Sequence, residues 1–137
     1  MDDEEYARWM ASARATLNSA VKDLDGGEYS WACFKAHQAA EKALKALLWG
    51  LGNPVYGHSL KRLYEEVERL VGDEERVRED CLRLDKYYTA TRYPDVWHAG
   101  VPEEYFSEGE ACEGVERAER VIGWVEEKWR LLKKEGV

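Results

Sequence analysis

The 137-residue sequence has few residues of the kinds that build disulfide-rich or metal-bound proteins: three cysteines, three prolines and three histidines. Cys33, Cys81 and Cys112 are odd in number and widely spaced, which argues against a disulfide framework or a thiolate metal site. We expect them to be small core residues. No histidine pair lies four residues apart and no histidine–cysteine cluster exists, so the sequence predicts no metal and no cofactor.

The sequence also lacks long apolar runs and glycine-rich phosphate loops. No run approaches the length that crosses a bilayer, and the amino-terminal residues 1–5 are acidic rather than basic and then apolar, so we expect a cytoplasmic protein without membrane contact. Gly50, Gly52 and Gly57 do not have the Walker or dinucleotide spacing. The few amide residues, Asn18, Gln38 and Asn53, in a chain with 35% charged residues indicate a thermophile as the source.

The charge balance is acidic, with 20 basic and 28 acidic residues and a net charge of −8. This argues against broad, non-specific adhesion to nucleic acid or anionic membranes, although a local basic patch stays compatible with it. The length is that of one domain with one continuous core, so we expect a single domain over residues 1–137.

Apolar residues recur at alternating spacings of three and four, which is the period of an amphipathic helix. The pattern predicts five helices, over about residues 3–24, 28–49, 60–70, 74–88 and 108–132, with Ser59 and Ser107 as N-caps. Glycine pairs and prolines separate them. The expected fold is all-α, an antiparallel up-and-down bundle, with one long aromatic loop from Thr89 to Phe106 on which function is expected.

Four segments, in order, resemble the HEPN family, which is named for nucleotide binding in higher eukaryotes and prokaryotes. They are Tyr29–Phe34, His37–Leu48, Gly57–Leu60 and Leu84–Asp95, and together they span most of the chain. The resemblance implies a helical bundle, a homodimer and pairing with a separately encoded minimal nucleotidyltransferase. In many such pairs the helical protein is a ribonuclease toxin that the nucleotidyltransferase neutralises, and other members bind nucleotides without cleaving anything.

The ribonuclease branch of the family uses an arginine followed a few residues later by a histidine. Arg92 and His98 have this spacing, so the resemblance implies that they are the catalytic pair of a metal-independent endoribonuclease, with two pairs meeting in a dimer. A histidine is suited to take the 2′-hydroxyl proton and an arginine to stabilise the charge on phosphate. Tyr93, Pro94 and Gly100 depart from the family pattern and weaken this interpretation.

Arg92 has a second, structural interpretation. Glu41 lies on the second helix beside its apolar side, where an unpaired carboxylate is costly. We therefore predict an ion pair between Glu41 and Arg92 that fixes the loop to the bundle.

The second helix also carries Lys35, Gln38, Lys42 and Lys45 at spacings of three and four. One hypothesis is that Lys42 and Lys45, with Arg92, bind the phosphates of a nucleotide or RNA. The alternative is an ordinary solvated helix face. His37 is interpreted as a structural histidine and His58 as part of the start of the third helix.

Two tryptophans, Trp31 and Trp49, fall off the apolar side of the second helix, so we expect them to be exposed at a partner surface. Three functions stay open from the sequence: a ribonuclease acting with a nucleotidyltransferase, a non-catalytic nucleotide-binding module, and a structural dimer or partner-docking module.

Overall fold

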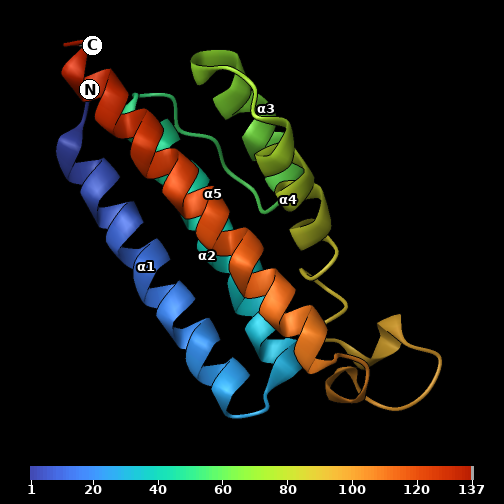
Figure 1. Cartoon of the computed structure of the whole chain (residues 1–137). Helices are drawn as coiled ribbons and strands as arrows, with labels where there is room; N and C mark the ends of the chain where they lie inside the picture. Colours follow the sequence, from blue (N-terminus) through green and yellow to red (C-terminus); the bar gives the residue numbers. More distant parts are fainter. Residues whose placement is uncertain (137) are drawn as a thin grey trace.

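The computed structural model describes residues 1–136, and within them the chain is all-α, as predicted. Three long helices, α1 (Asp3–Asp25), α2 (Tyr29–Gly50) and α5 (Glu108–Lys134), lie side by side (Figure 1). Two shorter helices, α3 (Leu60–Val71) and α4 (Glu75–Asp85), pack beside α2 and α5. Both chain ends lie at one end of the bundle, and the loop before α5 lies at the other (Figure 1).

The ends of the helices follow from local chemistry. Asp2, Ser59 and Ser107 cap α1, α3 and α5, each accepting a hydrogen bond from a backbone N–H of the first turn. The Ser107 cap, predicted from the sequence, is a capping box completed by Glu110. Gly72 ends α3 with a φ of 94°, a conformation that costs glycine little.

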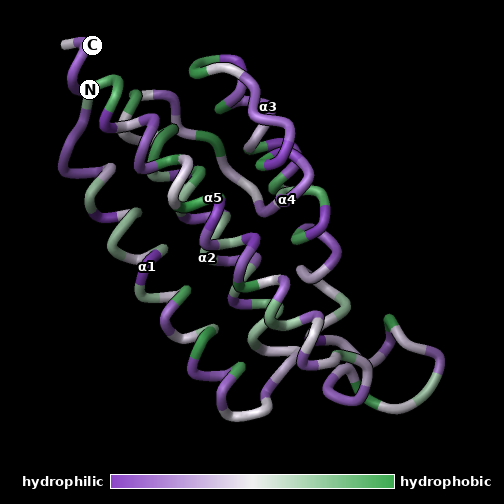
Figure 2. The backbone as a smooth tube through the Cα atoms, in the orientation of Figure 1, coloured by the Kyte–Doolittle hydropathy of each residue, from purple (hydrophilic) through white to green (hydrophobic). Residues whose placement is uncertain are grey.

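Helix α2 is the central element and contacts each of the other four helices. Its alanines Ala36, Ala39, Ala40, Ala43 and Ala46 are fully buried, so neighbouring backbones approach closely. The last residue of this helix, Gly50, lies against the Trp129 ring of α5, where a Cβ would be only 2.6 Å from the nearest ring carbon. Polar and apolar residues are interspersed along the helices (Figure 2).

The connection over residues 51–59 returns along the bundle, so α3 runs in the same direction as α2 (Figure 1). Asp85 at the end of α4 fixes the start of α3, since its carboxylate accepts the backbone N–H groups of Leu60 at 2.8 Å and Lys61 at 2.9 Å. Asp80, fully buried, fixes α4 on α5 through ion pairs with Arg117 at 2.8 Å and Arg120 at 2.7 Å.

Three sequence expectations about the fold need correction. Helix α4 ends at Asp85 rather than at Tyr88, and the next residues form turns. Trp49 is half-buried against Trp9, with ring centroids 5.0 Å apart, although Trp31 is exposed as predicted. Cys112 is half-buried on α5, whereas Cys33 and Cys81 are core residues. Within residues 1–136 no helix is long and apolar enough to span a membrane.

Candidate functional site

Arg92 is folded back onto the turn that precedes it. Its Nε donates a hydrogen bond of 2.9 Å to the carbonyl of Tyr88, and one terminal nitrogen donates to the same oxygen. The guanidinium carbon lies 4.1 Å from the centroid of the Phe34 ring and 4.8 Å from that of the Tyr88 ring. The cation is thus half-buried between aromatic rings, a favourable cation–π arrangement.

Exposed aromatic rings surround this arginine. Trp31 is 37% exposed and meets Phe34 edge to face, and Tyr93 is 48% exposed and lies beside the guanidinium group. We call this surface the Arg92 patch: Trp31, Phe34, Tyr88, Arg92 and Tyr93. Tryptophan, tyrosine and arginine are the residue types that contribute most to protein–protein binding energy.

The predicted ion pair between Glu41 and Arg92 is not formed. The Glu41 carboxylate is buried and accepts from Lys45 at 3.1 Å and from His58 Nδ1 at 2.9 Å. Lys45 lies one helical turn beyond Glu41 on α2. The carboxylate is therefore paired with a residue of its own helix and does not need a partner from the loop. Arg92 instead takes the rings of Phe34 and Tyr88 as its partners.

Two histidines contact the Tyr88 ring and tie it to the bundle. His58 stacks on it with a centroid separation of 5.0 Å, and His37 lies 5.1 Å away. His37 is fully buried and lies 3.3 Å from the Asp85 carboxylate, in agreement with a structural role. Burial alone raises the pKa of Asp85, but hydrogen bonds from His37 and from two backbone N–H groups outweigh it and hold that pKa below its ordinary value.

His98 lies in the loop, exposed to solvent, and its ring has no hydrogen bond to any residue within positions 1–136. Neither His98 nor Arg92 lines any of five surface pockets within residues 1–136. Among the described residues there is also no group of histidine, cysteine and carboxylate side chains that is able to hold a metal ion.

The lysines of α2 are bonded within the bundle rather than fully solvated. Lys42 donates to Thr16 at 2.9 Å, and Lys35 pairs with Asp23 at 2.7 Å and donates to Ser19 at 2.9 Å. Lys45 is buried against Glu41. The interpretation of these lysines as an ordinary solvated helix face is thus wrong. The Lys42 and Lys45 ammonium groups are already bonded within the bundle. The sequence contains the complementary signal, because Thr16, Ser19 and Asp23 are spaced by three and four on α1.

The comparisons with known proteins agree with this architecture. TT1696 from Thermus thermophilus is 40% identical in sequence, with 90% of this chain and 97% of that one covered and a TM-score of 0.87. ST0689, an archaeal HEPN homologue, is 36% identical, with 90% and 96% covered and a TM-score of 0.76. An HEPN domain protein from Thermotoga maritima is 32% identical, with 88% and 95% covered and a TM-score of 0.72.

None of the curated proteins matches the chain. The model of the HEPN domain family matches residues 6–128, which includes all five helices except the ends of α1 and α5. The chain belongs to the HEPN domain family.

Proposed function

We propose that this HEPN protein is a non-catalytic docking module that forms a homodimer and serves a minimal nucleotidyltransferase partner. The observation that carries the proposal is the use of Arg92. Its guanidinium is held by the Tyr88 carbonyl and two aromatic rings, which leaves it poorly placed to approach a phosphate. The same contacts make it the centre of an exposed aromatic surface.

The composition of the Arg92 patch supports a protein partner. Trp31 and Tyr93 present large amphipathic rings to solvent at little entropic cost, and Arg92 is already ordered between its neighbours. Interfaces between protein chains are enriched in these residue types and depleted in lysine and glutamate. The homodimer and the nucleotidyltransferase are the partners that the family resemblance implies.

The experiment is to measure the mass of the protein in solution by light scattering across a concentration series. The parent chain has a mass of 15.8 kDa and is expected at twice this value as a dimer. The Trp31→Ser and Tyr93→Ser variants remove exposed rings and should dissociate it. Tyr56→Ser is the matched control, since Tyr56 is 75% exposed outside the patch. Dissociation by the control alone, or by none of the variants, contradicts the proposal.

The partner arm of the proposal has its own test. A minimal nucleotidyltransferase encoded in the same genome is co-expressed with the parent chain and with each patch variant. Co-purification with the parent and with Tyr56→Ser, and its loss with Trp31→Ser or Tyr93→Ser, is the expected result. Absence of a complex with the parent chain would restrict the module to self-association.

A metal-independent ribonuclease is the second candidate, and the exposed His98 ring is the observation in its favour. The family resemblance implies a dimer in which two Arg92–His98 pairs meet. The test is cleavage of a mixed RNA substrate without metal by the parent and by folded Arg92→Ala and His98→Ala variants. Cleavage that both variants abolish would replace the docking proposal with this one.

A further inference from the structure

The loop that leads into α5 carries large apolar side chains that solvent reaches. Val96 is 47% exposed, Val101 is 43% exposed and Tyr105 is 42% exposed. None of the three belongs to the Arg92 patch. We call this region the loop surface: Asp95, Val96, Val101, Glu103 and Tyr105, all of which are exposed. Groups of exposed apolar side chains rimmed by polar residues are typical of interaction sites.

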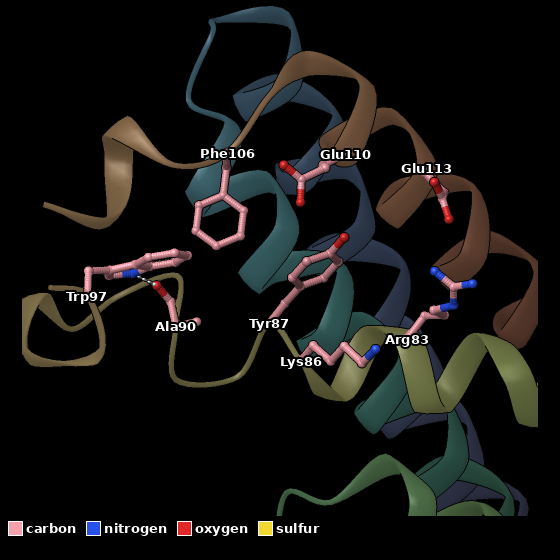
Figure 3. A pocket seen from close by; sticks show the side chains of 8 residues that line it. All are labelled: Arg83, Lys86, Tyr87, Ala90, Trp97, Phe106, Glu110 and Glu113. Atoms are coloured by element: carbon pink, nitrogen blue, oxygen red, sulfur yellow. Dashed lines mark hydrogen bonds between the residues drawn. The ribbon is translucent and has the colours of Figure 1, made fainter.

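Contacts inside the loop hold the loop surface in one shape. The Trp97 ring stacks on Tyr105 with centroids 4.0 Å apart, and it donates its N–H to the Ala90 carbonyl at 2.7 Å (Figure 3). The Val101 N–H donates to Glu104 Oε1 at 3.1 Å. Because the loop is ordered by its own contacts, a partner that binds to it loses little free energy in ordering it.

The charge on and around the loop surface is of one sign. Residues 93–116 contain seven carboxylates and no lysine or arginine. Asp95 and Glu103 of the loop surface form no ion pair with any residue between positions 1 and 136. The apolar side chains of the loop surface are therefore accompanied by carboxylates whose charge the bundle does not neutralise.

Two cations at the end of α4 border this acidic stretch without neutralising it. Arg83 and Lys86 lie across Tyr87 from the Trp97 ring (Figure 3). Within the part of the chain that the structure describes, residues 1–136, the one ion pair of Arg83 is the 3.8 Å contact with Glu79, and Lys86 has none. Neither cation is thus paired with a carboxylate of the loop surface.

This combination of charge and apolar surface determines the chemistry of a suitable partner. A surface with unpaired carboxylates repels phosphates, nucleic acids and anionic membranes. It attracts lysine and arginine side chains, while apolar side chains of the same partner gain from burial on the exposed valines and tyrosine. An amphipathic helix with a basic polar face presents both kinds of side chain at spacings of three and four.

We propose that the loop surface docks a basic amphipathic helix of a protein partner. Apolar side chains of this helix pack on Val96, Val101 and Tyr105, and its lysines and arginines pair with Asp95 and Glu103. The proposal goes beyond the function of the Arg92 patch, because it concerns different residues and a partner that is defined by its charge. Exposed ion pairs of this kind are screened by salt, so the affinity should fall as the ionic strength rises.

The test is calorimetric titration of the full-length protein with a designed peptide of leucine and lysine that folds as an amphipathic helix. One control peptide has the same composition in an order that gives no apolar face, and a second has glutamate in place of lysine. We expect the amphipathic peptide to bind about tenfold more tightly than the first control, and the second control not to bind. Equal binding of the first control, or no binding of the amphipathic peptide at millimolar concentration, would overturn the proposal.

Variants show whether the peptide binds on the loop surface. Val96→Ser and Val101→Ser remove exposed side chains and keep the contacts that order the loop, and together they should raise the Kd about tenfold. Glu103→Gln should raise it about threefold, the effect of one exposed ion pair. Val21→Ser and Glu4→Gln are the matched controls, since both residues are exposed on α1, and should leave the Kd unchanged. A Kd that the double valine variant leaves unchanged rejects the assignment.

Light scattering separates the proposed helix from a second copy of this chain as the occupant of the loop surface. The double valine variant should keep the mass that the parent has under the same conditions. A lower mass of this variant would mean that a second copy covers the loop surface, and the proposal would be wrong. Because the comparison is with the parent, its result does not depend on whether the Arg92 patch forms a dimer.

Discussion

Arg92 and Tyr88 contact each other in two ways at once. The guanidinium Nε donates to the Tyr88 carbonyl at 2.9 Å, while its carbon lies 4.8 Å from the centroid of the Tyr88 ring. The second ring, that of Phe34, belongs to α2, so the pair fixes the turn after α4 on the central helix. Arginine is suited to this position because its planar group is able to stack and donate simultaneously.

The first prediction concerns the stability that Arg92 provides. Arg92→Ala loses the ring contacts and the backbone hydrogen bonds, and we expect a loss of about 1–3 kcal/mol in the free energy of unfolding, measured by urea denaturation. Arg92→Lys should lose nearly as much, because an ammonium lacks the planar fork. Arg130→Ala removes a solvent-exposed pair with Glu127 and should leave the free energy of unfolding nearly unchanged. An Arg92→Lys protein as stable as the parent would contradict the stacking argument.

The second prediction concerns the buried pair of Glu41 and Lys45. Lys45→Met deletes the ammonium and leaves the carboxylate with His58 as its partner, so we expect a loss of about 2–4 kcal/mol. Adding Glu41→Gln should restore part of this loss, because the uncompensated charge is removed. Lys42→Met, whose partner is the neutral Thr16, serves as control with a smaller loss. Additive effects of the two substitutions in a double-mutant cycle would show that the pair does not interact.

The fold could be predicted from the sequence because its signals are local. The serine caps and the apolar period of α1, α2 and α5 each depend on residues within one or two turns. The end of α4 was missed because the carboxylate of its last residue, Asp85, binds two N–H groups at the start of α3, which lie 24 and 25 residues earlier in the chain.

The candidate site was predicted less well, because its partners are set by tertiary packing. Both Lys45 and Arg92 were available to Glu41 by charge, and only the packed structure selects Lys45. The Phe34–Arg92 contact joins α2 to the loop and has no signature in spacing. The matched polar residues of α1 and α2, such as Thr16 and Lys42, were a signal that comparison of the two helices could have found.

The third prediction is a pH dependence that arises from Asp85. Its folded-state pKa lies below the unfolded value, so the ionised carboxylate stabilises the fold at pH values above the unfolded pKa, about 3.9. This contribution is lost as the pH falls through the folded pKa, and the parent protein should lose stability below about pH 4. Asp85→Asn should lower the free energy of unfolding by about 1–2 kcal/mol at pH 7. Its stability should then change less with pH below about pH 4 than that of the parent. Exposed Asp95→Asn is the control and should follow the parent curve.

The fourth prediction separates the three cysteines by reactivity. Burial, with a contribution from Glu110, raises the pKa of Cys33 to about 12, and burial also raises that of Cys81. The thiolate is the reactive form, so both should resist an aromatic disulfide reagent at about pH 8 in the folded protein. Half-buried Cys112 should react first, giving one thiol per chain, and denaturant should release all three. Rapid labelling in a folded Cys112→Ser variant would show that the core opens more readily than its packing implies.

The last prediction compares two helical glycines that meet different surroundings. Gly50 lies where a Cβ would be 2.6 Å and 2.8 Å from ring carbons of Trp129 and 3.0 Å from the Tyr6 Cβ, and these two rings are themselves stacked at 4.2 Å. Gly50→Ala must displace the stack and should destabilise the fold by about 1–3 kcal/mol. Gly123, exposed on α5, has no atom within 4 Å of the position that an added methyl carbon would take, so Gly123→Ala should stabilise by up to about 1 kcal/mol through helix propensity alone. The melting temperatures of the two variants should therefore shift in opposite directions. An increase in both would mean that the α2–α5 contact is looser than the Trp129 packing indicates.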